Sequence, residues 1–237
     1  MKMNKKKVFT LALAVCLIAI LSMGSLAWFS DSDAVDNNFY VGDGGENADD
    51  IFSVDIWEQV DTDEDGTPDL IVGKDDAVAD DNSYDYKEVI PGDTLYKAVN
   101  VTNTGSNDEW VRVSVTIDNV AVWAELANKY GFKLEELLLR YDMTKLTESS
   151  SWTYAPNETA VDVTADKVTY VFYMNSTLKA GRWANFIYHV EIPEELNQHD
   201  LAMFKDNLFT MSFKVDAIQV ENINADNAMD AFAIVNG

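Results

Sequence analysis

The residues of this chain whose types and spacing come closest to a known chemistry lie in a short acidic run. Residues 61–69 read Asp-Thr-Asp-Glu-Asp-Gly-Thr-Pro-Asp. Oxygen-bearing side chains alternate along this run, and a glycine in the sixth place permits a sharp turn, as in the first half of a calcium-binding loop. The predicted calcium ligands are Asp61, Asp63, Asp65, Thr67 through its carbonyl oxygen, and Asp69.

The calcium interpretation has an open alternative. The twelfth place of the loop, where a bidentate Glu closes such a site, is Val72, so the closing carboxylate would have to come from Asp75 or Asp76. The other interpretation is a solvated acidic hairpin tip between a strand ending at Val60 and a second strand over residues 70–72. Thermal stabilisation by calcium separates the two, because crowded carboxylates repel one another without a cation.

Residues that could act in catalysis are few. The chain has two histidines, His189 and His199, without the spacing of a zinc helix, and its one cysteine is Cys16. It has no nucleophile-elbow motif and no phosphate-binding glycine loop. The carboxylates could include a glycosidase pair, but an acidic surface explains them equally well. We therefore expect that the protein is not an enzyme.

The tryptophans suggest binding or packing rather than catalysis. Six are present, and Trp57 and Trp110 each fall opposite the aliphatic positions of their segment. A tryptophan in such a position either covers a second packing surface or presents its ring to a ligand such as a sugar. The sequence leaves both interpretations open.

The charge of the chain limits its partners. The formal net charge is −24, from 41 acidic and 17 basic residues. Like charge repels nucleic acid and anionic membrane surfaces, so we expect neither as a partner. The charge favours solubility, calcium or cationic partners.

The elements that position these residues are mostly strands. Apolar residues recur with a period of two, which is typical of strands with one buried face. Phe186, Tyr188, Val190 and Ile192 form one such apolar set. A turn at residues 103–108 predicts a hairpin over Thr94 to Asp118. The six predicted strands cover residues 52–57, 95–101, 111–117, 168–172, 186–192 and 209–215.

Helical spacing is confined to three places. A helical insertion is predicted over residues 120–141, a short helix within residues 193–207 and a terminal helix over residues 225–235. Acidic segments at 42–50 and 73–86 are interpreted as surface loops. The predicted fold is all-β: an antiparallel, jelly-roll-like β-sandwich with short helical insertions, forming a single domain over residues 28–237.

The N-terminus has the pattern of an export signal. Four lysines precede an apolar run from Val8 to Leu21, and small residues at Ser25 and Ala27 fit the pockets of a signal peptidase. We predict cleavage between Ala27 and Trp28, which separates residues 1–27 from the secreted domain and removes Cys16. Retention as a membrane anchor and lipidation at Cys16 are the alternatives. The expected location is extracellular, in the matrix or at the cell surface.

Three groups of residues together resemble a known family. The signal running into Gly24-Ser25-Leu26-Ala27-Trp28-Phe29-Ser30-Asp31 resembles the SipW-dependent signal region of TasA and camelysin-type proteins of Gram-positive bacteria. The segments Ile90-Pro91-Gly92-Asp93-Thr94 and Val99 to Val113 are similar to the family's Pro-Gly-Asp strand, Asn-x-Gly turn and return strand. Residues 213–220 and 230–233 are similar to its closing strand and tail.

This resemblance implies a function in assembly. It implies a jelly-roll-like domain, released by a dedicated signal peptidase, that polymerises into biofilm fibres as a homo-oligomer or filament, together with other matrix proteins. Residues 28–41 would then be a donor strand that pairs with the neighbouring subunit, and their alternative is pairing with their own sheet. The protease label of the camelysin branch has no support here, because no zinc motif is present.

The rival interpretation is a calcium-stabilised surface module that binds surface glycans or another protein. Its predicted contacts are Trp57, Trp110 and the acidic loops. Filaments that grow without residues 28–41 would refute strand donation, whereas glycan binding by a strictly monomeric protein would favour the rival.

Overall fold

A computed structural model describes residues 30–34, 37–39, 53–63, 67–73, 84, 86, 89–135, 151–204, 210–221 and 223–236. The signal segment, the predicted cleavage site at Ala27 and Trp28, and Asp65 of the acidic run lie outside the described residues. So do the acidic loop at 42–50, most of residues 73–86, and residues 136–141 of the predicted helical insertion.

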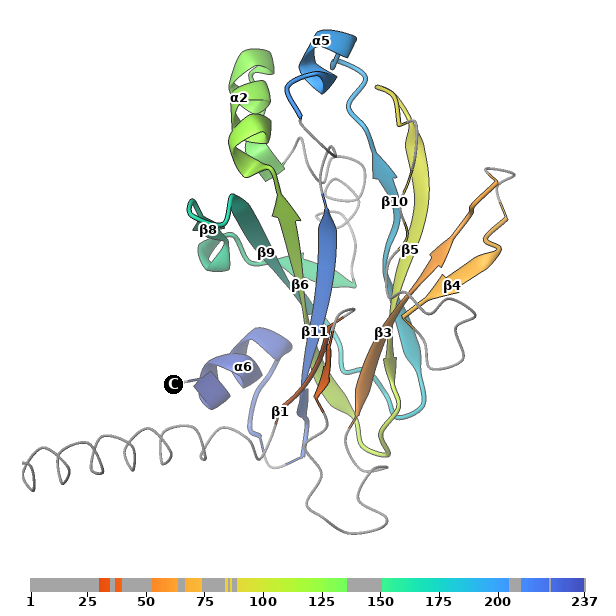
Figure 1. The fold of residues 1–237 in the computed structure, drawn as a ribbon. Helices are drawn as coiled ribbons and strands as arrows, with labels where there is room; N and C mark the ends of the chain where they lie inside the picture. Colours follow the sequence, from red (N-terminus) through yellow and green to blue (C-terminus); the bar gives the residue numbers. More distant parts are fainter. Residues whose placement is uncertain are drawn as a thin grey trace, which may run out of the picture.

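Two antiparallel sheets face each other as a β-sandwich (Figure 1), which confirms the predicted all-β class. The first sheet has the strand order β2-β1-β11-β6-β9-β7, with β8 also paired to β9, and the second has the order β10-β5-β3-β4. The first sheet contains β1 (Ser30–Ala34), β2 (Asn37–Phe39), β6 (Glu109–Asp118), β7 (Trp152–Tyr154), β8 (Ala160–Asp162), β9 (Lys167–Met174) and β11 (Met211–Gln219). The second contains β3 (Val54–Val60), β4 (Leu70–Val72), β5 (Thr94–Asn103) and β10 (Trp183–Glu191). All six predicted strands are present.

The main core lies between the two sheets, where alternate residues of each strand are buried. The residues that β6 contributes to the main core are Val111, Val113, Val115 and Ile117, which is the predicted apolar set. They meet Val54, Ile56, Val99 and Val101 of the second sheet within one cluster. Since burying such a side chain stabilises the fold by about 1.5–3 kcal/mol, this alternation sets which face of each strand turns inward.

A smaller second core lies on the outer face of the first sheet, under the helix α6 (Ala228–Asn236). Trp110, Ile218 and Phe232 pack together there, and Trp110 is 8% exposed. The predicted terminal helix is thus confirmed. Of the two interpretations of Trp110, the structure supports packing, because a ring buried in this way is not available to stack on a ligand.

Two further helices lie at one end of the sandwich, at the top of Figure 1. Helix α2 (Val120–Tyr130) ends at Gly131, whose φ of 74° allows its backbone N–H to donate to the Ala127 carbonyl. Helix α5 spans Gln198–Leu201, so it is a single turn and shorter than the sequence suggested; a 3-10 turn lies at Pro156–Glu158. None of the helices in the described part of the chain is long and apolar enough to cross a membrane.

The predicted hairpin over Thr94 to Asp118 is wrong. Its two arms are β5 and β6, which belong to different sheets, so the turn at 103–108 carries the chain from one layer to the other. Asn103 organises this crossing. Its Nδ2 donates to the carbonyls of Asn107 (2.7 Å) and Leu178 (3.0 Å), and its Oδ1 accepts from the Gly105 N–H (2.9 Å).

The prediction for Tyr188 is also wrong. The period of two groups it with Phe186, Val190 and Ile192 as residues of one buried face. Its side chain is 51% exposed, whereas Phe186 and Ile187 are both buried. The pairing of β10 with β5 shifts register between Asn185 and Ile187 and again between Ile187 and His189. Each irregularity changes which side chains face inward, so a strict period of two fails here.

Candidate functional site

The structural feature that bears most directly on assembly is the edge of the first sheet. Strand β1 pairs antiparallel with β11 in five consecutive positions, from Ser30 opposite Ile218 to Ala34 opposite Lys214. Strand β2 folds back on β1 and borders the sheet with three residues. The described parts of the predicted donor strand, residues 30–34 and 37–39 of segment 28–41, therefore pair within their own chain (Figure 1).

Strand β1 contains few apolar residues. Its five residues are Ser-Asp-Ser-Asp-Ala. The register sets Asp31 opposite Ala217 and Asp33 opposite Val215. Since Ala34 is the one apolar residue of the five, the sequence of β1 offers mainly its main-chain pairing with β11 to hold it in the sheet.

Strand β11, in contrast, is held firmly from its other side. It pairs with β6 in nine consecutive positions. Arg112 of β6 donates through Nε and Nη2 to Oδ2 of Asp216, and the shorter of these hydrogen bonds is 2.6 Å. Lys214 approaches the other oxygen of Asp216 at 2.8 Å. Departure of β1 would leave β11 in place.

Arg112 also ties β11 to α6. Burial would lower the pKa of Arg112, but the charge and hydrogen bond of Asp216 outweigh this effect and the pKa is raised. The Cζ atom of Arg112 lies 4.5 Å from the centre of the Phe232 ring, within the range of a cation–π interaction. A charged Arg112 therefore links β11 to the helix that covers the outer face.

The acidic run lies at the turn of the β3–β4 hairpin. Thr62 donates to Asp69 through its backbone N–H (2.9 Å, to Oδ1) and through its hydroxyl (2.6 Å, to Oδ2), and these hydrogen bonds lower the pKa of Asp69. Asp61 is buried, whereas Asp63 and Thr67 are exposed. Within the described residues, no group of three or more His, Cys, Asp or Glu side chains is arranged to hold a metal. Because Asp65 is not described, the calcium loop stays a prediction.

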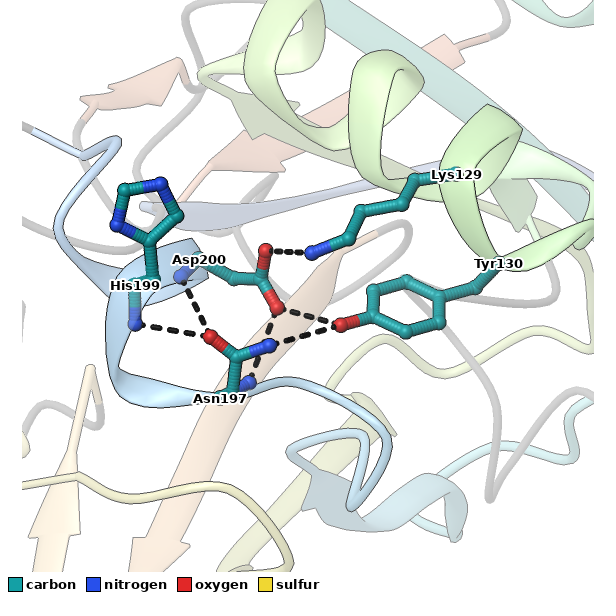
Figure 2. A network of polar contacts seen from close by, with 5 residues as sticks. All are labelled: Lys129, Tyr130, Asn197, His199 and Asp200. Atoms are coloured by element: carbon teal, nitrogen blue, oxygen red, sulfur yellow. Dashed lines mark hydrogen bonds and ion pairs between the residues drawn. The ribbon is translucent and has the colours of Figure 1, made fainter.

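The two histidines take up different positions. The His189 ring meets the Tyr96 ring edge to face, with centroids 5.4 Å apart, on the pair of strands β10 and β5. His199 lies in α5 beside the polar network of Figure 2 and joins it through its backbone N–H, which donates to Oδ1 of Asn197 (2.9 Å).

Asp200 is the centre of that network. Its carboxylate, 1% exposed, accepts hydrogen bonds from Lys129, from the Tyr130 hydroxyl (2.5 Å) and from the Asn197 N–H (3.0 Å). Burial alone would raise the pKa of Asp200, but these donors outweigh it and the pKa is lowered. The network joins the end of α2 to α5, and its role is structural.

Comparison with known proteins adds no relative. No protein-family model matches the chain, no curated protein matches it, and no solved structure matches it.

Sequence reasoning missed two features of the candidate sites. The first is the pairing of β1 with β11. Ser30–Ala34 has no apolar alternation, so the sequence could not identify β11 as the partner strand. Trp183 was one of six tryptophans without a distinguishing pattern, yet it is 61% exposed on β10. The available signal was its place between Ala180-Gly181, a dipeptide typical of a turn, and the predicted strand over residues 186–192.

Proposed function

We propose that this protein is a secreted structural protein of the cell surface or extracellular matrix that assembles into fibres by donating its N-terminal strand to a neighbouring subunit. The observation that carries the proposal is the position of β1. It is a polar, five-residue strand near the N-terminus that pairs along the edge of a well-anchored β11.

The physical basis is an exchange of equivalent hydrogen bonds. An antiparallel strand supplies the same main-chain donors and acceptors to the β11 edge whether it belongs to the same molecule or to another. The sequence of β1, Ser-Asp-Ser-Asp-Ala, supplies one apolar residue, so it carries no apolar pattern that would specify one particular copy. The export signal and the family resemblance support an extracellular setting, where a chain without cysteine after Ala27 needs burial, metal or assembly for its stability.

A disulfide trap tests the exchange directly. Ala34 and Lys214 are directly opposed, and opposed Cα atoms in antiparallel strands lie about 4.5–5.5 Å apart, within disulfide range. The chain from Trp28 onward with Ala34→Cys and Lys214→Cys is oxidised as dilute monomer and as filament, then separated without reductant. We expect an intrachain bond in the monomer and a ladder of covalent oligomers in the filament.

The matched control pairs Ala34→Cys with Val163→Cys. Val163 is 85% exposed just beyond β8, and β11, β6 and β9 separate β8 from β1 in the sheet. This pair should give no ladder. Filaments whose Ala34→Cys/Lys214→Cys chains carry only intrachain disulfides would show that β1 stays in its own subunit and would refute strand donation.

Deletion gives a second, independent test. A chain that begins at residue 42 should remain folded, because β11 keeps its full pairing with β6, but it should not extend filaments. Circular dichroism checks the fold and electron microscopy checks the filaments. Filaments of normal length from this truncated chain would contradict the proposal.

A further inference from the structure

The outer face of the second sheet carries an ordered arrangement of aromatic and polar side chains on three adjacent strands. The register places Asp55, Thr102 and Trp183 in one row across β3, β5 and β10, and Trp57, Asn100 and Asn185 in the next row. These six residues, which we call the outer platform, alternate with Ile56, Val99 and Val101, whose side chains face the core.

The Trp57 ring is fixed on this platform. Its indole N–H donates a hydrogen bond of 2.9 Å to Oγ1 of Thr102, which lies one row away and next to Trp183. The ring of Trp57 therefore leans across β5 toward the row of Trp183. The two indoles lie on opposite sides of Thr102, one from β3 and one from β10.

The amide groups of the platform are fixed as well. Asn185 donates through Nδ2 to Oδ1 of Asn100 (3.2 Å) and to the carbonyls of Val99 (3.2 Å) and Ile187 (2.9 Å). Asn100 in turn donates to the Ala98 carbonyl (3.2 Å) and is buried. These contacts hold the β10 edge, and with it Trp183, against β5 at the first of the two register shifts.

We propose that the outer platform binds a neutral polysaccharide chain. Trp183, 61% exposed, offers the flat apolar surface on which the C–H face of a sugar ring stacks, and Trp57 offers a second, half-buried one. Thr102 lies between the two indoles, and Asp55 and Asn185 lie on either side of it, so that partly exposed polar side chains border both rings within reach of sugar hydroxyls.

The chemistry of the platform disfavours other occupants. An anionic polymer would meet Asp55 and a chain of net charge −24, and both would repel it. The buried centre of a protein interface is more apolar than its rim, whereas the two indoles here are separated by polar side chains. Repeating sugar units, apolar on their faces and polar at their rims, match this alternation.

The test uses cellohexaose and chitohexaose as neutral probes and polygalacturonate as an anionic one. Tryptophan fluorescence titrations are performed in parallel on the full chain and on the form beginning at Trp28. We expect saturable binding of at least one neutral hexasaccharide and none of polygalacturonate. Trp183→Ala and Trp57→Ala should each weaken that binding at least tenfold, and Thr102→Val, which removes the hydrogen bond that orients Trp57, should weaken it severalfold.

Two controls separate binding from folding. Ile234→Ala alters an equally exposed apolar residue on α6, against the other sheet, and should bind as the parent does. Circular dichroism and melting curves verify that each variant is folded, and Trp183→Phe, which keeps a flat ring, should recover most of the affinity. Failure of both neutral hexasaccharides to bind at millimolar concentration, or unchanged binding by Trp183→Ala, would overturn the proposal, whatever the outcome of the filament experiments.

Discussion

Asn103 and Leu178 are joined by a hydrogen bond of 3.0 Å, from the Asn103 Nδ2 to the Leu178 carbonyl oxygen, at the point where the chain leaves one sheet for the other. Asn103 lies at the end of β5, and Leu178 bridges to Glu109, the first residue of β6. A fully buried amide thus links the two layers.

Asn103→Ala should be strongly destabilising. The substitution removes three hydrogen bonds of a fully buried side chain, although the Leu178 carbonyl still accepts from the Glu109 N–H and the Gly105 N–H still donates to the Ser53 carbonyl, so we expect the free energy of unfolding to fall by about 2–3 kcal/mol. Urea unfolding measures the change. Ser106→Ala, at an exposed position in the same turn, is the control and should shift stability by less than about 0.5 kcal/mol. Equal effects for the two variants would contradict the role given to Asn103.

Asp200 should make the protein sensitive to acid. Its pKa is lowered in the folded state, below an unfolded value of about 3.9. Its contribution to stability is therefore fully present above that value and is lost as the pH falls through the folded-state pKa. Asp200→Asn should lower the melting temperature at pH 7 by several degrees relative to the parent. Between pH 5 and pH 2, the melting temperature of this variant should fall less steeply than that of the parent. Asp226→Asn, at an exposed position, should leave both unchanged.

The contact of Phe232 with Arg112 and Tyr173 should anchor α6 to the first sheet. The Phe232 and Tyr173 ring centroids are 5.6 Å apart, and Phe232 is buried. Phe232→Ala should reduce the free energy of unfolding by about 3 kcal/mol and shift tryptophan fluorescence to the red as Trp110 becomes hydrated. Ile234→Ala on the same helix, at a position 56% exposed, should do neither. An unchanged spectrum for Phe232→Ala would show that α6 does not shield Trp110.

The calcium-loop prediction can be decided by melting curves. If residues 61–69 bind calcium, millimolar calcium must raise the melting temperature by mass action, and a chelator must reverse the change. Asp63→Asn and Asp65→Asn should then abolish the rise, whereas Glu221→Gln, an exposed carboxylate outside the run, should not. Identical curves with calcium and with chelator would leave residues 61–69 as an acidic hairpin turn closed by Thr62 and Asp69.

The sequence predicted which segments form strands better than it predicted which strands pair with one another. A period of two shows which face of a strand is buried, and this was enough for Val111 to Ile117. It does not show which sheet a strand joins, so the turn after Asn103 was misinterpreted as a hairpin. That outcome depends on hydrogen bonds to Leu178, 75 residues away in the sequence.

The candidate sites were less predictable for related reasons. Ser30–Ala34 carries no apolar pattern, so its pairing with β11 depends on main-chain groups that every sequence possesses. On β10 the register shifts around Ile187 break the alternation that would have assigned Tyr188 to a face. Trp57 was correctly assigned to the face opposite the core, because β3 alternates without interruption.

The pairing of β1 with its own β11 also sets a threshold for association. Strand β1 belongs to the same chain as the β11 edge on which it docks. Linkage within one chain holds such a segment near its docking edge at an effective concentration on the order of millimolar. A strand offered by another molecule competes against that value, so dilute chains should remain closed by their own β1. If strand donation drives assembly as proposed, growth would begin only where many copies are crowded together, so self-pairing would control where a fibre can start.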